Sequence, residues 1–196
     1  MELLLLAVGA GLAALVVVGL FGARGLRRRD LRKKAQTRLQ WGDLANAAKL
    51  FEESKDFTRA ASLYREAGER LKAAQINVTL SDFDAAIEVL RGGRPDEIEA
   101  GAALLEKARA LSDRGRAGTM ATIASNAGLA TLSASLFEKA GNSEEARASR
   151  LQEARTLAAQ GKPLEAAAIY EKLGEVRPAA AAHAEAARRE ADPAKK

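Results

Sequence analysis

The chain has 196 residues and a formal net charge of +5, and it contains no Cys, one His and few aromatic residues. Because aromatic and β-branched residues favour strands, this composition predicts an all-α fold. It excludes disulfides, thiolate catalysis and metal sites built from several Cys or His ligands. No motif combines a nucleophile with a base, and none matches a phosphate-binding or calcium-binding loop. We therefore expect a non-enzymatic protein with no catalytic residues, no cofactor and no metal.

Residues 3–21 predict a single transmembrane helix. They are uncharged and mostly apolar, and nineteen residues at about 1.5 Å each would span about 28 Å, close to the thickness of a bilayer's hydrocarbon core. A cleaved signal peptide would carry positive charge before the apolar run and a small-residue cleavage site after it. Here Glu2 precedes the run and an Arg-rich stretch follows it, which favours a permanent anchor.

The segment over residues 22–40, which we expect to be helical, holds most of the net positive charge. Residues 22–38 contain eight basic side chains and one acidic side chain, whereas residues 39–196 are close to neutral. Basic residues beside a membrane span stay on the cytoplasmic side and contact anionic lipid. We therefore expect the N-terminus outside and the soluble domain in the cytoplasm, as at a bacterial inner membrane. The basic cluster consists of Arg24, Arg27, Arg28, Arg29, Arg32, Lys33 and Lys34.

Two alternatives concern these N-terminal segments. RNA binding by the basic cluster would require interleaved aromatic residues for base stacking, and none is present, so we expect no nucleic-acid partner. Within the span, small residues such as Ala7, Gly11 and Ala14 would let a second copy pack closely. Homodimerisation through the transmembrane helix therefore stays open.

A periodic pattern runs through residues 41–188. Its turn positions are Gly42, Lys55, Gly68, Ser81, Gly128 and Gly161. A small residue follows each of them by five positions, an aliphatic residue by eight, and an aromatic residue by nine in four cases. Small residues let helices cross closely, and large residues one turn later fill the gap beside them. The packing residues that we single out are Ala47, Phe51, Ala60, Tyr64, Phe137, Ala166 and Tyr170.

The spacing of the turn positions indicates helical repeats. From Gly42 to Ser81 they follow one another at a constant interval of thirteen, which we call the short step. The interval from Gly128 to Gly161 is thirty-three, the long step, and it is a helix–turn–helix repeat length. Residues 94–127 break this phase. There, Pro95 predicts a helix that runs to about Leu111, followed by a turn over residues 114–118.

The C-terminal part contains further helix starts. Pro163 and Pro178 each predict one, and we expect a flexible tail over residues 189–196. His183 follows Gly174 by nine positions, so it falls in the column that aromatic residues occupy elsewhere. We expect it to be a packing residue or a partly exposed one.

These motifs resemble the tetratricopeptide repeat (TPR), which has a glycine, a small residue five later, an aromatic nine later and an alanine twelve later. Ala60, Tyr64 and Ala67 match three of these positions, with Lys55 in place of the glycine. Gly161, Ala166 and Tyr170 match three positions in the later repeat. Residues 42–91 are also similar to the irregular repeats of SNAP-type adaptors. The resemblance implies an α-solenoid of antiparallel helix pairs whose groove binds peptides or partner helices.

The expected function is that of a membrane-anchored adaptor or scaffold that binds other proteins. The layout resembles bacterial inner-membrane TPR adaptors, although the Cys-ligated metal module of that family is missing here. The alternative is a permanent structural subunit of a secretion, motility or division machine. A fixed large complex on native gels would favour the subunit, and a free monomer or dimer would favour the adaptor.

Overall fold

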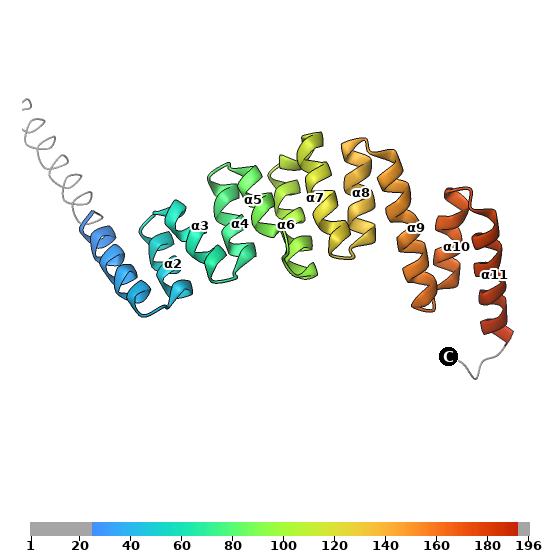
Figure 1. Cartoon of the computed structure of the whole chain (residues 1–196), viewed down its shortest axis with the longest axis horizontal. Helices are drawn as coiled ribbons and strands as arrows, with labels where there is room; N and C mark the ends of the chain where they lie inside the picture. The colour runs from blue at the N-terminus through green and yellow to red at the C-terminus, as the bar shows by residue number, and fades with distance from the viewer. Residues whose placement is uncertain (1–24, 192–196) are drawn as a thin grey trace, which may run out of the picture. The chain divides into compact units, whose positions relative to one another are not determined.

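The computed structural model describes residues 25–191, which are helical with short turns and contain no strand (Figure 1). The chain divides into two compact units, one ending at Ser81 and the other beginning at Asp82. The all-α class is therefore confirmed for this range. No helix within residues 25–191 is long and apolar enough to cross a membrane. The predicted span over residues 3–21, Arg24 and the last residues, 192–196, lie outside the described range.

The first unit is built from one longer helix followed by three short helices of equal length. Residues 25–40 are helical, as predicted for the basic segment. Three ten-residue helices follow: α2 (Leu44–Glu53), α3 (Phe57–Glu66) and α4 (Arg70–Thr79). α2 packs on α3, and α3 packs on α4. Successive helices begin at the short step that the turn positions predicted.

The turns of the first unit have a common local structure. Gly42, Lys55 and Gly68 adopt left-handed backbone angles, with φ of 73°, 65° and 79°. An acidic residue follows each turn and precedes the next helix, and the Asp43 carboxylate accepts the backbone N–H of Asn46. Such a cap satisfies one of the free N–H groups at a helix start. The short step is thus one helix plus a left-handed turn.

The second unit contains helices of less regular length, from 8 residues in α5 to 17 in α9. Consecutive helices from α7 onward pack side by side and run in alternating directions (Figure 1). The starts of α8 and α10 are separated by the long step, and so are the starts of α9 and α11. The longer repeat is therefore confirmed for these two pairs. The elements are α5 (Phe83–Leu90), α6 (Pro95–Lys107), the 3₁₀ turn η1 (Ala110–Ser112), α7 (Arg114–Asn126), α8 (Ala130–Ala140), α9 (Ser143–Ala159), α10 (Pro163–Lys172) and α11 (Val176–Ala191).

The structure corrects two predictions between residues 94 and 127. α6 ends at Lys107 rather than near Leu111, because Arg109 adopts a left-handed φ of 58° and the chain enters η1. Residues 114–118 are not a turn but the start of α7, where the Asp113 carboxylate accepts the backbone N–H of Arg116 at 2.9 Å. A Cβ at Gly118 would lie 3.6 Å from the Cβ of Ala140, an ordinary contact distance. Gly118 therefore lies where α7 packs beside the end of α8.

The C-terminal end also differs from the prediction. α11 continues to Ala191, past residue 189, where we expected the flexible tail to begin. Two Arg–carboxylate contacts lie in this last part of the helix, and the guanidinium of Arg189 is 3.0 Å from Glu185 one turn earlier. Contacts of this spacing support a helix.

Small residues at the predicted column form the close contacts of both units. The residue five positions after each turn is buried to 1% exposure or less in all six cases, from Ala47 to Ala166. The residue nine positions after each turn is buried as well, including Phe51, Tyr64 and Tyr170. The core is therefore rich in alanine, with larger side chains filling the space beside the close contacts.

Candidate binding groove and basic face

A groove opens on the surface of the second unit, where faces of α6, α8 and α9 converge. Its volume is about 440 Å³, within the range of ligand-binding clefts. α6 contributes residues spaced by three or four positions, which lie on one face of a helix. The lining residues are Glu99, Ala102, Ala103, Glu106, Leu111, Thr131, Leu132, Ser135, Leu136, Lys139 and Arg150.

The floor of the groove is apolar. Ala102, Leu111 and Leu136 are buried beneath it, Leu132 is half-buried, and Ala103 is exposed. A second cavity of about 200 Å³ shares Glu99, Thr131 and Leu132 with the first and extends toward Leu157, Thr156 and Gln160. The groove therefore continues along α8 toward α9, where its lining is half polar.

The rim of the groove is charged, and most of its charges are paired. The Lys139 ammonium lies 2.7 Å from Glu106. The Arg150 guanidinium lies 2.9 Å from Glu153 and 3.2 Å from Glu138. Partial burial opposes the charged form of Arg150, but the hydrogen bonds to Glu153 and Glu138 outweigh it and raise the pKa of this guanidinium. The ion pairs thus fix the rim between the helices.

Glu99 is the exception on this rim. It is exposed and lines both cavities, and it makes no ion pair with any residue in the described range. The Glu153 carboxylate nearby is already engaged, since it accepts a 2.8 Å hydrogen bond from the Thr131 hydroxyl as well as the contact from Arg150. The groove therefore offers an apolar floor, with one carboxylate at its edge that a cation on a ligand would neutralise.

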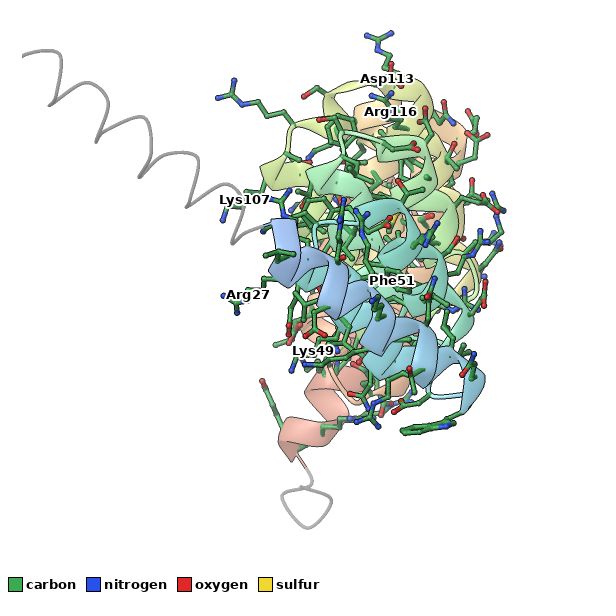
Figure 2. All side chains as sticks on the ribbon, turned by 90° about the vertical axis from the view of Figure 1, so that its left-hand side faces the viewer. Arg27, Lys49, Phe51, Lys107, Asp113 and Arg116 are labelled. Carbon is green, nitrogen blue, oxygen red and sulfur yellow. The ribbon has the colours of Figure 1, made fainter. Side chains whose placement is uncertain are left out.

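The described members of the basic cluster lie in the first unit. Arg27, Arg28, Arg29, Arg32, Lys33 and Lys34 are all exposed or half-buried on the helix over residues 25–40, and Figure 2 shows Arg27 pointing away from the ribbon. Lys34 pairs with Asp30 at 2.9 Å, and Arg32 lies 3.7 Å from Asp56. The other four make no ion pair with residues 25–191. Their charge is therefore available to a ligand.

The repeat-packing residues have structural positions. Ala47, Phe51, Ala60, Tyr64, Phe137, Ala166 and Tyr170 are all buried, and none of them lines the groove. The Tyr64 hydroxyl donates a 2.9 Å hydrogen bond to Glu52, joining α3 to α2. Burial, together with this hydrogen bond, raises the pKa of Tyr64 above its usual value.

His183 does not occupy the core. Its side chain is about half exposed, and its Nε2 lies 2.8 Å from a carboxylate oxygen of Glu171. The neighbouring Ala182 is buried instead. No group of three His, Asp or Glu side chains within residues 25–191 is arranged to hold a metal ion.

The resemblance to TPR solenoids predicted a binding groove, but the sequence did not predict which residues line it. Of the residues in the predicted columns, only Leu136 lines it. The others come from faces of α6, α8 and α9 that carry no repeated motif. A weak signal was present, because Glu99, Ala102, Ala103 and Glu106 place two small residues between charged ones on one face of α6.

Comparison of the chain with protein-family models, with curated proteins and with solved structures finds no match. The class of the protein therefore rests on its own architecture. It is an all-α, helical repeat-like protein, with consecutive helices packed side by side in each unit.

Proposed function

We propose that the chain is a membrane-anchored adaptor or scaffold, and that the groove of its second unit binds other proteins. The observation that carries this proposal is the apolar floor bounded by α6, α8 and α9, with fixed charges along its rim. Grooves of this kind bind an amphipathic helix or an extended peptide, because apolar side chains of the ligand enter the floor and polar ones meet the rim.

The repeat pattern supports a TPR-like or SNAP-like identity for the helical units. α8 and α9, and likewise α10 and α11, form successive pairs separated by the long step. α8 and α10 each keep a buried small residue and a buried aromatic residue at the spacing of the TPR motif, as Ala166 and Tyr170 do in α10. TPR-like solenoids commonly act as binding scaffolds.

The apolar residues 3–21 and the basic segment after them support a single-pass anchor. An anchor of this kind would confine the groove to the cytoplasmic surface of the membrane. Confinement raises the effective concentration of partners in the same membrane. A moderate intrinsic affinity would then be enough for stable binding.

The chemistry of the groove specifies the partner in part. Lys139 and Arg150 are already paired with carboxylates, so they attract an acidic ligand weakly. Glu99 is exposed, without an ion-pair partner in residues 25–191. We therefore expect a partner segment with apolar side chains at helical spacing and a Lys or Arg directed at Glu99.

Two substitutions on α6 test the proposal. Ala103 and Ala100 are both exposed, but only Ala103 lines the groove. Ala103→Arg would place a long side chain over the apolar floor, and Ala100→Arg is the matched control with the same change in charge. In pull-downs from detergent extracts, we expect specific partners to be retained by the wild type and Ala100→Arg and lost by Ala103→Arg. Equal recovery by all three proteins would rule out the groove as the binding site.

A further inference from the structure

Trp41 is the only tryptophan in the chain, and it is 70% exposed. Tryptophan is mostly buried in folded proteins, so this exposure is unusual. The side chain is held in place on the surface: the Arg38 guanidinium lies 5.5 Å from the centroid of its ring, and Arg38 also contacts Asp43 at 3.3 Å. An ordered, exposed indole therefore lies in the turn directly after the helix over residues 25–40.

Trp41 lies on the same side of this helix as several of the basic residues. Arg27, Lys34 and Trp41 recur at every seventh position, a spacing that follows one line along a helix. A second line, about a third of a turn away, carries Arg29 and Lys33, and Asp30, which pairs with Lys34, lies between the two lines. The opposite side of the helix buries Ala35 within the first unit. The outward face thus carries basic side chains in two lines and one acidic side chain, with an aromatic residue at one end.

A nucleic acid and a membrane would both attract such a basic face. A single indole provides no platform for stacking several bases. In contrast, tryptophan is enriched at the membrane–water interface, where its ring is buried and its N–H group meets the headgroups. The apolar run over residues 3–21 ends six positions before Arg27, which would place this face beside the bilayer. These observations favour a lipid surface.

We propose that the outward face of helix 25–40 lies along the anionic headgroups of the bilayer, and that Trp41 inserts its indole at the interface. This inference rests on the membrane anchor of the proposed function. It adds an orientation: the basic helix lies on the membrane instead of rising from it. Trp41 follows Arg27 by fourteen positions, or about 21 Å along the helix. A helix standing upright would therefore keep Trp41 in water.

Because Trp41 is the only tryptophan, the intrinsic fluorescence of the unmodified full chain reports its position. The protein is reconstituted in vesicles of phosphatidylcholine alone or of an equimolar mixture with phosphatidylglycerol. In the anionic vesicles we expect emission at shorter wavelength, severalfold stronger quenching by brominated lipid, and weaker quenching by acrylamide. About 1 M NaCl should reverse these changes, since the Debye length is then about 3 Å.

Matched charge variants test whether the basic face causes the insertion. A triple variant changes Arg27, Arg29 and Lys33 to Gln, and it should lose the shift in anionic vesicles. The control carries the same substitutions at positions in the second unit that are also exposed and without ion pairs in the described range. Its changed residues are Lys107, Arg155 and Arg177. It should keep the wild-type shift.

The possible failures are distinguishable from one another. Extraction with alkaline carbonate first establishes whether the protein is inserted in the vesicles. An inserted protein whose Trp41 stays in water in both kinds of vesicle would overturn the proposed orientation and leave the anchor intact. A shift that ignores lipid charge and disappears on dilution of the protein would indicate a second copy as the occupant, and would also overturn it. Release of the protein by carbonate would show that it is not inserted, and this result would overturn the membrane anchor together with the orientation that rests on it.

Discussion

The ammonium group of Lys139 on α8 lies 2.7 Å from a carboxylate oxygen of Glu106 on α6, so an ion pair connects two of the helices that line the groove. Both side chains are about half exposed. Exposed pairs contribute about 0–1 kcal/mol to stability. The pair is therefore more important for the charge of the rim than for folding.

Lys139→Gln should increase the affinity for a basic partner. It leaves Glu106 without its counter-charge, so the rim becomes more negative, while the free energy of unfolding changes by less than about 1 kcal/mol. Titrating a partner recovered by the wild type at low and high salt measures the effect, with Lys172→Gln on α10 as the control. Weaker binding by Lys139→Gln at low salt would contradict the assigned polarity of the partner.

Gly101 and Gly118 should respond in opposite ways to substitution by Ala. A Cβ at Gly101 would overlap Cδ1 of the fully buried Leu90 and lie 2.7 Å from its Cδ2, so Gly101→Ala should lower the free energy of unfolding by about 1–3 kcal/mol. At Gly118 the nearest contact would be an ordinary 3.6 Å. Gly118→Ala should therefore raise it by about 0.5–1 kcal/mol, as expected inside a helix. Chemical denaturation measures the free energy of unfolding of both variants. A Gly101→Ala variant as stable as the wild type would contradict the packing of α5 on α6.

Tyr64→Phe removes the hydrogen bond to Glu52 and should lower the free energy of unfolding by about 1 kcal/mol near neutral pH. The difference from the wild type should depend on pH. The pKa of Tyr64 is raised in the folded protein, by burial and by this hydrogen bond, whereas an unfolded Tyr ionises near about pH 10. Its contribution is therefore complete below that pH and is lost as the pH rises toward the folded pKa. Denaturation curves from about pH 8 to 12 measure the stability difference between the wild type and Tyr64→Phe. A difference that grows above about pH 10 would contradict the stabilising hydrogen bond from Tyr64 to Glu52.

Ser81→Gly should stabilise the first unit. Ser81 has a φ of 60°, a conformation that costs a residue with a side chain about 1–2 kcal/mol. The greater freedom of Gly in the unfolded chain offsets part of this gain, so we expect a net increase of about 0.5 kcal/mol. The reciprocal variant is Gly68→Ala, at a φ of 79° with no atom near the added Cβ. Its free energy of unfolding should fall by about 1 kcal/mol, and thermal unfolding of the two variants measures both changes.

Sequence reasoning worked best where one structural demand recurs along the chain. Turns need a left-handed residue, and close helix crossings need a small one, so the positions of Gly42 and Ala47 reappear at the short and long steps. The exposure of the basic residues from Arg27 to Lys34 agrees with their composition, since so many like charges are not buried together. These two features depend on local patterns that a single sequence displays.

The same reasoning failed where one residue type serves two purposes. Gly115 and Gly118 look like turn residues, but both lie in α7, and Gly118 lies beside Ala140. The residues that line the groove were missed for a different reason. Its lining comes from three helices whose contributing faces, around Ala103, Leu132 and Arg150, share no motif and meet only in the folded unit.

The most direct test of the binding function places a photo-crosslinking amino acid at a single position of the full-length protein in cells. At Ala103, inside the groove, we expect crosslinks to a partner protein; at Ala100, exposed on the same helix but outside the groove, we expect none of these products. Mass spectrometry of the crosslinked segment should find apolar residues at helical spacing together with a Lys or Arg. Equal crosslinking from both positions, or none from Ala103, would contradict the account.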